Sequence, residues 1–358
     1  MRSARFIFPH RGKTVAQRPV GGKSGARDLA PGPETAYQRH ERKRETGVMA
    51  RITVLGECMV EMSPDGQAED GAPRYRMGFA GDTFNTAVYM ARLGDAVAYC
   101  TALGHGDPFS EGVLAAMRRE GLDTRLVREA SNRLPGLYAI VLDASGERKF
   151  HNWRERAPIR DLFSEHTADQ LIEAAKASDL VYLSGVTLAV IGDIGRARLK
   201  DILAYVHSLG VAVALDFNYR PALWASPEAA RSALDGIVPS CRYVSLSSED
   251  SRPLYGREAE DLAAQWAALG AEVVARDESH AVNVHRPEGR TATPPPGRVK
   301  AIDTTGAGDS FNAAYLSSRL AGLSIETAIA RAHALAATVV TCKGAIVPIA
   351  SMPVFERG

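Results

Sequence analysis

Short apolar runs typical of β-strands alternate with amphipathic helical stretches along most of this chain. A helix between two strands favours parallel pairing, because it provides the crossover that parallel neighbours need. Repeated several times, the pattern predicts an α/β protein with a mainly parallel sheet and helices on both faces. The expected strands are 52–55, 96–102, 179–183, 211–215 and 242–246, and the expected helices are 82–93, 108–120, 167–176, 194–208 and 227–236.

Two of the expected helices begin with residues that favour a helix start. Asp82 or Thr83 is expected to accept hydrogen bonds from the first amides of helix 82–93, since short oxygen-bearing side chains satisfy amides that lack a partner within the helix. Asp107 followed by Pro108 indicates the start of the next helix, because proline fits the first helical turn.

The segments 58–79 and 136–153 interrupt the alternation. The second contains two extended runs around the turn at 143–146 and is predicted to form a hairpin. Both segments follow core strands, so they could pair into a small β-sheet over the carboxyl ends of those strands, where ligands bind in open α/β sheets. A lid over a ligand site is the functional hypothesis, and an ordinary surface hairpin is the alternative.

The first 48 residues differ in composition from the rest of the chain. They hold 11 Lys and Arg against 4 Asp and Glu, contain Gly and Pro, and show no apolar periodicity. Such a segment cannot bury enough apolar surface to offset the entropy of ordering it. We therefore expect a disordered basic extension at 1–48 and a folded domain at 49–358. The alternative is a segment for targeting or nucleic-acid binding.

The composition of the whole chain bears on its class. Hydrophobic residues make up 45% and charged residues 24%, and no apolar run approaches the ~18 residues that a membrane-spanning helix needs. The cysteines lie far apart in the sequence, which favours neither a zinc site nor a disulfide framework and indicates a reducing cytoplasm. They are Cys58, Cys100, Cys241 and Cys342.

The segment 303–312 reads DTTGAGDSFN and opens an amphipathic helix. Small residues let successive backbone N–H groups converge on an anion, and the unpaired amides and dipole of a helix start favour a phosphate. A carboxylate repels phosphate, so Asp309 is unsuited to anion binding alone. We interpret Asp309 as the acceptor of a proton from a hydroxyl that attacks the phosphate. The alternative is an ordinary Gly-rich helix start with an acidic first turn.

This segment resembles the C-terminal signature of the ribokinase-like (PfkB) carbohydrate kinases, and the similarity extends over residues 51–353. Within that family the chain is most similar to the 2-keto-3-deoxygluconate kinases. The order of the matching segments along the chain makes the resemblance specific. They are LGECMVE at 55–61, AGDTFNTA at 80–87, LSGVTLA at 183–189, DFNYRPALW at 216–224 and KGAIVP at 343–348.

The resemblance implies a Rossmann-like three-layer α/β/α sandwich with a small β-sheet lid. It implies ATP and Mg²⁺ as cosubstrates, with a monovalent cation as a further candidate, and phosphoryl transfer to the C6 hydroxyl of a keto-deoxy sugar acid. The expected partners are small molecules, with neither nucleic acid nor membrane among them. A homo-oligomer is a further expectation, because edge strands of the lid could pair between subunits.

Position by position, the resemblance assigns Asp309 as the catalytic base and Gly306, Ala307 and Gly308 as the anion hole over the transferring phosphoryl group. Gly308 and Gly306 are thereby also cofactor-binding candidates. The general base contributes alongside positioning and electrostatics, which dominate phosphoryl transfer.

On the sugar side, Gly81 and Asp82 match the family's Gly-Gly-Asp turn, whose first glycine is replaced by Ala80 in this chain. Arg154 matches the lid arginine and Arg220 the arginine of the Asn-Tyr-Arg-Pro segment. Independently of the family, a guanidinium can hold a carboxylate through two charge-assisted hydrogen bonds, which suits a sugar acid. For each arginine the alternative is a solvated charge or a surface ion pair. Tyr138 is a candidate to pack on the sugar, or simply within the lid.

On the nucleotide side, Ser248 and Arg276 are the candidate ATP contacts. Family members often carry Asn-x-x-Glu near the metal; this chain keeps Glu249, which we expect to act on Mg²⁺ through water, but has Leu246 at the asparagine position. The alternative for this stretch is a helix cap by Ser247 or Ser248.

The strand and turn at 272–281 also depart from the family pattern. Similar kinases have Val-Lys-x-Gly there, and this chain has Arg276 and Glu278 at the lysine and glycine positions. A carboxylate near a polyphosphate is expected to repel it. Glu278 and Leu246 therefore leave open a catalytically impaired ligand-binding homologue. A separate alternative to a sugar-acid kinase is a kinase for another sugar or a nucleoside, such as fructose or ribose.

Overall fold

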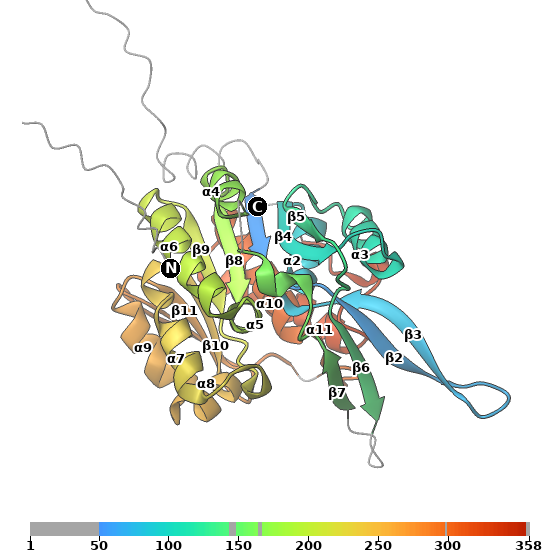
Figure 1. Ribbon diagram of the computed structural model, residues 1–358. Coiled ribbons are helices and arrows are strands. Elements are labelled where there is room, and N and C mark those ends of the chain that lie inside the picture. Colours follow the sequence, from blue (N-terminus) through green and yellow to red (C-terminus); the bar gives the residue numbers. More distant parts are fainter. Residues whose placement is uncertain (1–49, 143–147, 164–166, 298, 356–358) are drawn as a thin grey trace, which may run out of the picture. The chain divides into compact units, whose positions relative to one another are not determined.

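In this computed structural model, residues 50–142, 148–163, 167–297 and 299–355 are described, and their strands form a large sheet and a small one (Figure 1). The predicted disordered extension at 1–48 and the predicted turn at 143–146 lie outside the described residues. None of the described helices combines the length and the hydropathy that crossing a bilayer requires.

Among the described residues the large sheet has nine strands in the order β13-β12-β11-β10-β9-β8-β1-β4-β5. The strands from β11 to β5 are parallel, which confirms the expectation, and β12 and β13 are antiparallel additions at one edge. The bounds are β1 (Arg51–Leu55), β4 (Ala96–Gly104), β5 (Val127–Ala130), β8 (Leu180–Ser184), β9 (Ala212–Asp216), β10 (Tyr243–Ser247), β11 (Glu272–Arg276), β12 (Val282–Arg286) and β13 (Gly289–Thr293).

Helices cover both faces of this sheet, so the three-layer α/β/α architecture is confirmed. Successive strand residues enter different cores: Val54 packs in one hydrophobic cluster and Leu55 in the other. Four helices bury side chains in the Val54 cluster: α2 (Asp82–Arg92), α3 (Pro108–Arg119), α10 (Ala307–Leu320) and α11 (Ile325–Val340).

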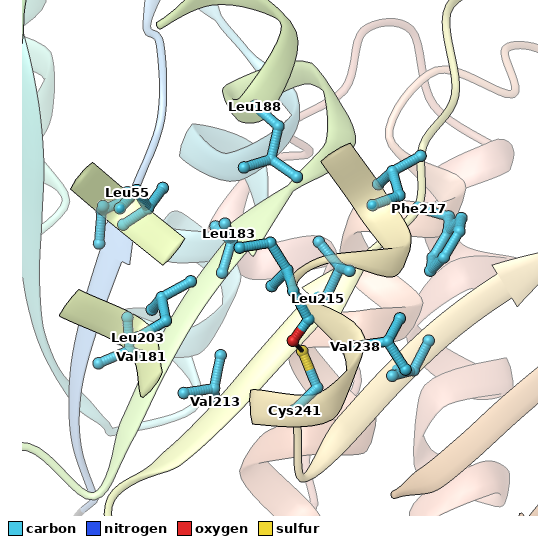
Figure 2. Close-up of a cluster of buried hydrophobic side chains, with 14 of the residues drawn as sticks. Leu55, Val181, Leu183, Leu188, Leu203, Val213, Leu215, Phe217, Val238 and Cys241 are labelled. Carbon is cyan, nitrogen blue, oxygen red and sulfur yellow. Dashed lines mark hydrogen bonds between the residues drawn. The ribbon is translucent and has the colours of Figure 1, made fainter. Parts of the chain in front are cut away.

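The Leu55 cluster joins residues of β1, β8 and β9 to those of the opposite helical layer, and Figure 2 shows part of it. Because both faces of the central strands are buried, these strands consist of nearly continuous apolar runs. The helices of this layer are α4 (Thr167–Lys176), α5 (Gly185–Val190), α6 (Gly192–Ser208), α7 (Pro227–Asp235), α8 (Ser248–Tyr255) and α9 (Ala259–Ala267). Short 3-10 turns occupy Pro158–Asp161, Pro221–Leu223, Val238–Ser240 and Ile349–Ser351.

The two segments that interrupt the alternation form the small sheet, with the strand order β3-β2-β6-β7 among the described residues. The predicted hairpin is confirmed, since β6 and β7 pair antiparallel, and β2 joins the two hairpins by pairing parallel to β6. In Figure 1 this sheet lies at the end toward which the arrow of β8 points. The bounds are β2 (Met59–Gln67), β3 (Pro73–Ala80), β6 (Leu137–Leu142) and β7 (Arg148–Trp153).

The predicted caps of the first two helices have different outcomes. Asp107 caps α3 as expected, accepting hydrogen bonds from the amides of Phe109 at 3.0 Å and Ser110 at 2.9 Å. The prediction for α2 was wrong: the capping position is Gly81, without a side-chain cap, and Asp82 is already the first helical residue. The carboxylate of Asp82 instead accepts a hydrogen bond from Asn218, a partner that the local sequence does not indicate.

Candidate active site

The candidate residues gather at the carboxyl ends of the central parallel strands. The chain passes from β1 outward to β4 and returns on the other side of β1 as β8, which makes the junction of β1 and β8 a topological switch point. Open α/β sheets bind ligands in the crevice outside the strands at such a point. Arg220 follows β9, Ser248 follows β10, and Arg276 ends β11, so all three face this edge of the sheet.

The start of α10 has the backbone that the glycine-rich motif predicts. Gly306 precedes the helix with φ of 79°, in the left-handed region that side chains disfavour. A Cβ atom there would lie 2.6 Å from the carbonyl oxygen of Ala345, so the site needs glycine for space as well as for conformation. Of the predicted anion-hole amides, that of Ala307 already donates to the carbonyl oxygen of Thr304 at 3.2 Å.

A buried tyrosine fixes the loop behind this helix start. The hydroxyl of Tyr89 donates to the carbonyl oxygen of Ala345 at 2.7 Å and accepts from the amide of Val347 at 3.1 Å. On the other side, Asp303 accepts a hydrogen bond from the amide of Gly344 at 2.7 Å. The loop is therefore held against Gly306 from two sides.

Arg276 brings a positive charge to the helix start. Its Nη1 atom lies 3.7 Å from the place of a Cβ on Gly308, and its guanidinium lies 5.0 Å from the ring centroid of Phe311. Its Nη2 atom donates to the hydroxyl of Ser245 at 3.1 Å, while its buried Nε–H has no partner in the part of the chain that the structure describes. The arginine that replaces the family's lysine is thus placed to attract an anion bound at α10.

Asp309 lies in the first turn of α10 and receives a hydrogen bond on its Oδ2 atom from Nδ2 of Asn85, at 2.8 Å. Burial of the carboxylate raises its pKa well above the ordinary range, and the nearby charge of Asp82 adds to the increase. The hydrogen bond from Asn85 lowers the pKa, Asp216 raises it, and Arg220 lowers it. A carboxylate whose pKa is raised in this way accepts a proton more readily.

The expected sugar-binding turn lies beside Asp309. A Cβ on Gly81 would lie 2.2 Å from the carbonyl oxygen of Glu57, so this position requires glycine. Asp82 accepts a hydrogen bond from Asn218 at 2.7 Å. Asp216 is buried nearby, and loss of hydration raises its pKa to about 7, against the opposing effect of Arg276.

Arg220 reaches the same carboxylates from the loop after β9. Its side chain is 58% exposed, and its closest acidic contact is with Asp250 at 3.8 Å. Because Arg220 lowers the pKa of both Asp309 and Asp216, its charge acts at the centre of the cluster. It is an arginine with spare donors at the edge of the site.

The two candidates on the small sheet each contact a buried glutamate. Arg154 pairs with Glu57, whose side chain is only 4% exposed, and Tyr138 donates its hydroxyl hydrogen to Glu61. Burial raises the pKa of Glu57, and the Arg154 charge opposes that shift. The Asp309 charge also contributes to the raised pKa of Tyr138, so the small sheet faces the start of α10. Arg154 is the candidate that already has a counter-ion.

The metal candidate directly follows Ser248, at the start of α8. Glu249 is exposed in the first turn of α8, and Leu246 is fully buried in the hydrophobic core, where it offers nothing to a cation. Ser247 caps α8 through the amide of Asp250 at 3.2 Å, which was the alternative for this stretch, and Ser248 is buried. Within the described ranges no group of three or more His, Cys, Asp or Glu side chains could hold a metal ion.

Glu278, which stands at the family's glycine position, has an ion-pair partner in the structure. Arg252 of α8 pairs with Glu278 and also with Glu258, the latter at 2.6 Å. The charge that the sequence places at the family's glycine position is therefore compensated by an arginine.

Sequence reasoning missed the residues that support the predicted ones. Asn85, Asn218 and Glu57 lie inside segments that carry the family resemblance, and this is the signal that could have drawn attention to them. Their roles depend on partners far away in the chain, since Asn85 and Asp309 are 224 positions apart.

Comparison with known proteins identifies the family of this chain. Residues 49–352 match the family model for the pfkB family carbohydrate kinases. The chain is 40% identical over 312 residues to the 2-dehydro-3-deoxygluconokinase of Dickeya dadantii, covering 84% of this chain and 98% of that protein.

Two solved structures show the fold at 21% identity. The 2-dehydro-3-deoxygluconokinase of Thermotoga maritima aligns with a TM-score of 0.71, over 83% of this chain and 96% of that one. A putative ribokinase II of E. coli in complex with ATP and Mg²⁺ aligns with a TM-score of 0.72, over 83% of this chain and 95% of that one.

A helix start that requires glycine, beside a buried carboxylate on a ribokinase-like fold, is typical of a class of kinases, and the chain belongs to the pfkB family of carbohydrate kinases. It is a phosphotransferase with an alcohol group as acceptor. Enzymes of this family take the phosphoryl group from ATP.

Proposed function

We propose that this protein is an ATP-dependent kinase that phosphorylates the C6 hydroxyl of 2-keto-3-deoxygluconate. The name of the Dickeya dadantii relative supports the substrate. The observation that carries the proposal is the position of Asp309, next to a helix start flanked by Arg276 and within a cluster that Arg220 reaches.

In the proposed mechanism, Asp309 accepts the proton of the attacking hydroxyl while the oxygen of that hydroxyl bonds to the transferring phosphorus. The bond from phosphorus to the leaving oxygen breaks, and the electron pair leaves with ADP. Backbone amides of Gly306 and Gly308, the helix dipole and Arg276 stabilise the negative charge of the phosphoryl group. Gly81 and Asp82 bind the sugar, and Ser248 lies on the nucleotide side.

The metal would be held largely by the substrate. Mg²⁺ keeps several waters and binds through one or two carboxylates plus phosphates, so an isolated carboxylate such as Glu249 is compatible with it. When bound, Mg²⁺ neutralises charge on the phosphates. A monovalent cation remains part of the proposal as a further cofactor.

The two arginines have different tasks in this proposal. Arg154 already has the Glu57 carboxylate as its counter-ion, whereas the contact of Arg220 with Asp250 is long and its side chain is largely exposed. We assign the substrate carboxylate first to Arg220, with Arg154 as a second contact from the small sheet. In this proposal Tyr138 lies on the same side of the small sheet as Arg154.

Replacement of Arg220 should weaken binding of the sugar acid. A hydrogen bond to a charged group contributes about 1.5–3 kcal/mol, so Arg220→Ala should raise KM for the sugar acid roughly 10- to 100-fold, with a smaller effect on kcat. Steady-state kinetics with the sugar acid and with a neutral sugar measure this. Arg220→Lys should recover part of the affinity, and an unchanged KM in Arg220→Ala would rule out the carboxylate contact.

Removal of Arg252 should expose the nucleotide to the Glu278 charge. We expect Arg252→Ala to raise KM for ATP by about two- to fivefold at low salt, and by less at high salt, because exposed pairs contribute little and are screened. Glu258→Gln removes the other partner of Arg252 and is the matched control, with KM for ATP close to that of the wild type. Equal effects of the two substitutions would show that Glu278 does not act on ATP.

An ADP-release assay over a panel of acceptors tests the proposed function. We expect the full-length chain to turn over 2-keto-3-deoxygluconate at a higher kcat/KM than fructose, ribose or nucleosides. Faster turnover of a neutral sugar would favour the other kinases. Sugar-acid binding by calorimetry without detectable ATP binding would favour the impaired homologue.

The proposal extends to the small sheet and to the surroundings of the enzyme. The sheet acts as a lid in this proposal, because Arg154 follows β7 directly and Tyr138 of β6 lies close enough to Asp309 to sense its charge. Its outer side, with exposed Met77 and Trp153, borders a cavity of about 780 Å³ and is where we place contacts of a homo-oligomer. A cytoplasmic location, where ATP is available, completes the proposal.

A further inference from the structure

The side chain of Asn85 makes the direct contact with the predicted base. It lies in the first turns of α2, is only 4% exposed, and donates from Nδ2 to Oδ2 of Asp309 at 2.8 Å. Its own Oδ1 atom is buried and has no hydrogen-bond partner among the described residues. A buried carbonyl oxygen without a partner destabilises the fold. Stability alone therefore does not explain why this amide directs its NH₂ group at one oxygen of the carboxylate.

Neighbouring contacts hold the two helices in this register. The hydroxyl of Thr86, next to Asn85, lies 3.3 Å from the backbone carbonyl oxygen of Asp309 and 3.1 Å from that of Asp82. Helix α2 therefore contacts both the backbone and the side chain of Asp309. The position of the carboxylate is fixed by α2 as well as by its own helix.

We propose that Asn85 is a positioning residue for phosphoryl transfer: it holds Oδ2 of Asp309 and leaves Oδ1 directed to the acceptor hydroxyl. This inference rests on the proposed role of Asp309 as the base. It requires that Asn85 stabilise the ionised carboxylate, because an amide NH₂ donates to a carboxylate better than to its protonated form.

The charges around Asp309 make such a donor necessary. Asp82 of α2 and Asp216 of β9 disfavour ionisation of Asp309, and Arg220 favours it; the hydroxyl groups of Tyr89, Tyr182 and Tyr138 lie close enough to sense its charge. Arg276 lies at Gly308, one residue away. Two carboxylates oppose ionisation of Asp309, so a hydrogen-bond donor is needed to keep the base ionised. A neutral donor does this without adding a positive charge that would compete with the start of α10 for the phosphate.

The test is the pH dependence of kcat/KM for Asn85→Ala, measured with ATP and the acceptor that the wild type uses best. Loss of the donor raises the pKa of the base, so the acid limb of the profile should move up by about one pH unit, which corresponds to loss of a hydrogen bond to an ionised group. On the plateau, kcat should fall about tenfold through lost orientation. Asn312→Ala is the matched control.

Asn312 is equally buried and lies on α10 itself, but it bonds Ser245 and Tyr182 rather than Asp309. An acid limb that moves in Asn85→Ala and stays in Asn312→Ala supports the inference. An acid limb that stays in both, or moves equally in both, overturns it.

A second measurement uses the unaltered fold, in case Asn85→Ala does not fold. In protein labelled with ¹⁵N at asparagine, the side-chain NH₂ resonances of Asn85 should titrate with the acid limb, and the titration should vanish in Asp309→Asn. Resonances that do not titrate would overturn the inference. If Asp309→Asn retains its turnover, Asp309 is not the base, and the proposed function is affected. If Asp309→Asn loses turnover but the acid limb of Asn85→Ala stays where it is in the wild type, only the inference about Asn85 is overturned.

Discussion

Asp309→Asn should fold normally and lose about 10²- to 10⁴-fold in kcat, the usual contribution of a general base. The substitution removes a carboxylate whose ionisation is disfavoured by burial and by Asp82, so it should leave the thermal unfolding temperature unchanged or slightly higher. KM for ATP should change little, because the amides of the helix start stay in place. Steady-state kinetics and thermal unfolding of the two proteins measure these effects.

Asp216→Asn is the matched control for this prediction. Asp216 belongs to the same buried cluster, but the mechanism gives it no proton to accept, so its loss of kcat should be at least tenfold smaller than that of Asp309→Asn. Turnover near the wild-type value in Asp309→Asn would remove Asp309 from the mechanism. Equal losses in both variants would mean that the cluster acts through its total charge.

The architecture and the backbone at the centre of the candidate site could be predicted, because both depend on local sequence. Val54 and Leu55 enter opposite cores, so the strand needs an unbroken apolar run, and this run identifies a strand buried on both faces. The motif around Gly306 is equally local: the left-handed φ of 79° and the adjacent helix start require the residues that the motif contains.

Hydrogen bonds and ion pairs between distant segments could not be predicted from local sequence. Asp82 is a plausible helix cap by sequence, yet Asn218, at 136 positions' distance, donates to its side chain instead. The counter-ions of Arg154 and Glu278 are likewise supplied from elsewhere, by Glu57 and Arg252. Local patterns predict where a charged side chain is placed, but only the tertiary structure shows whether another charge has neutralised it.

Gly306→Ala should reduce turnover about 100-fold. The left-handed φ costs an alanine about 1–2 kcal/mol, and its Cβ would lie 2.6 Å from the carbonyl oxygen of Ala345, closer than a real contact allows. Tyr89 and Asp303 hold the loop of Ala345 in place, so the start of α10 has to move instead. Misplacing one donor to a developing oxyanion costs about 10²–10³-fold in kcat.

A second glycine separates the effect of the contact from the effect of the backbone angle. Gly121 follows α3 with φ of 75°, and a Cβ on it would meet no atom within 4 Å, so Gly121→Ala has the conformational cost without the clash. Both variants should show a lower unfolding temperature, but only Gly306→Ala should lose turnover and affinity for ADP with aluminium fluoride, a mimic of the transferring phosphoryl group. Gly306→Ala displaces the amides at the start of α10 but leaves the Asp309 carboxyl group chemically intact. Wild-type turnover in this variant would therefore mean that the phosphate is stabilised elsewhere.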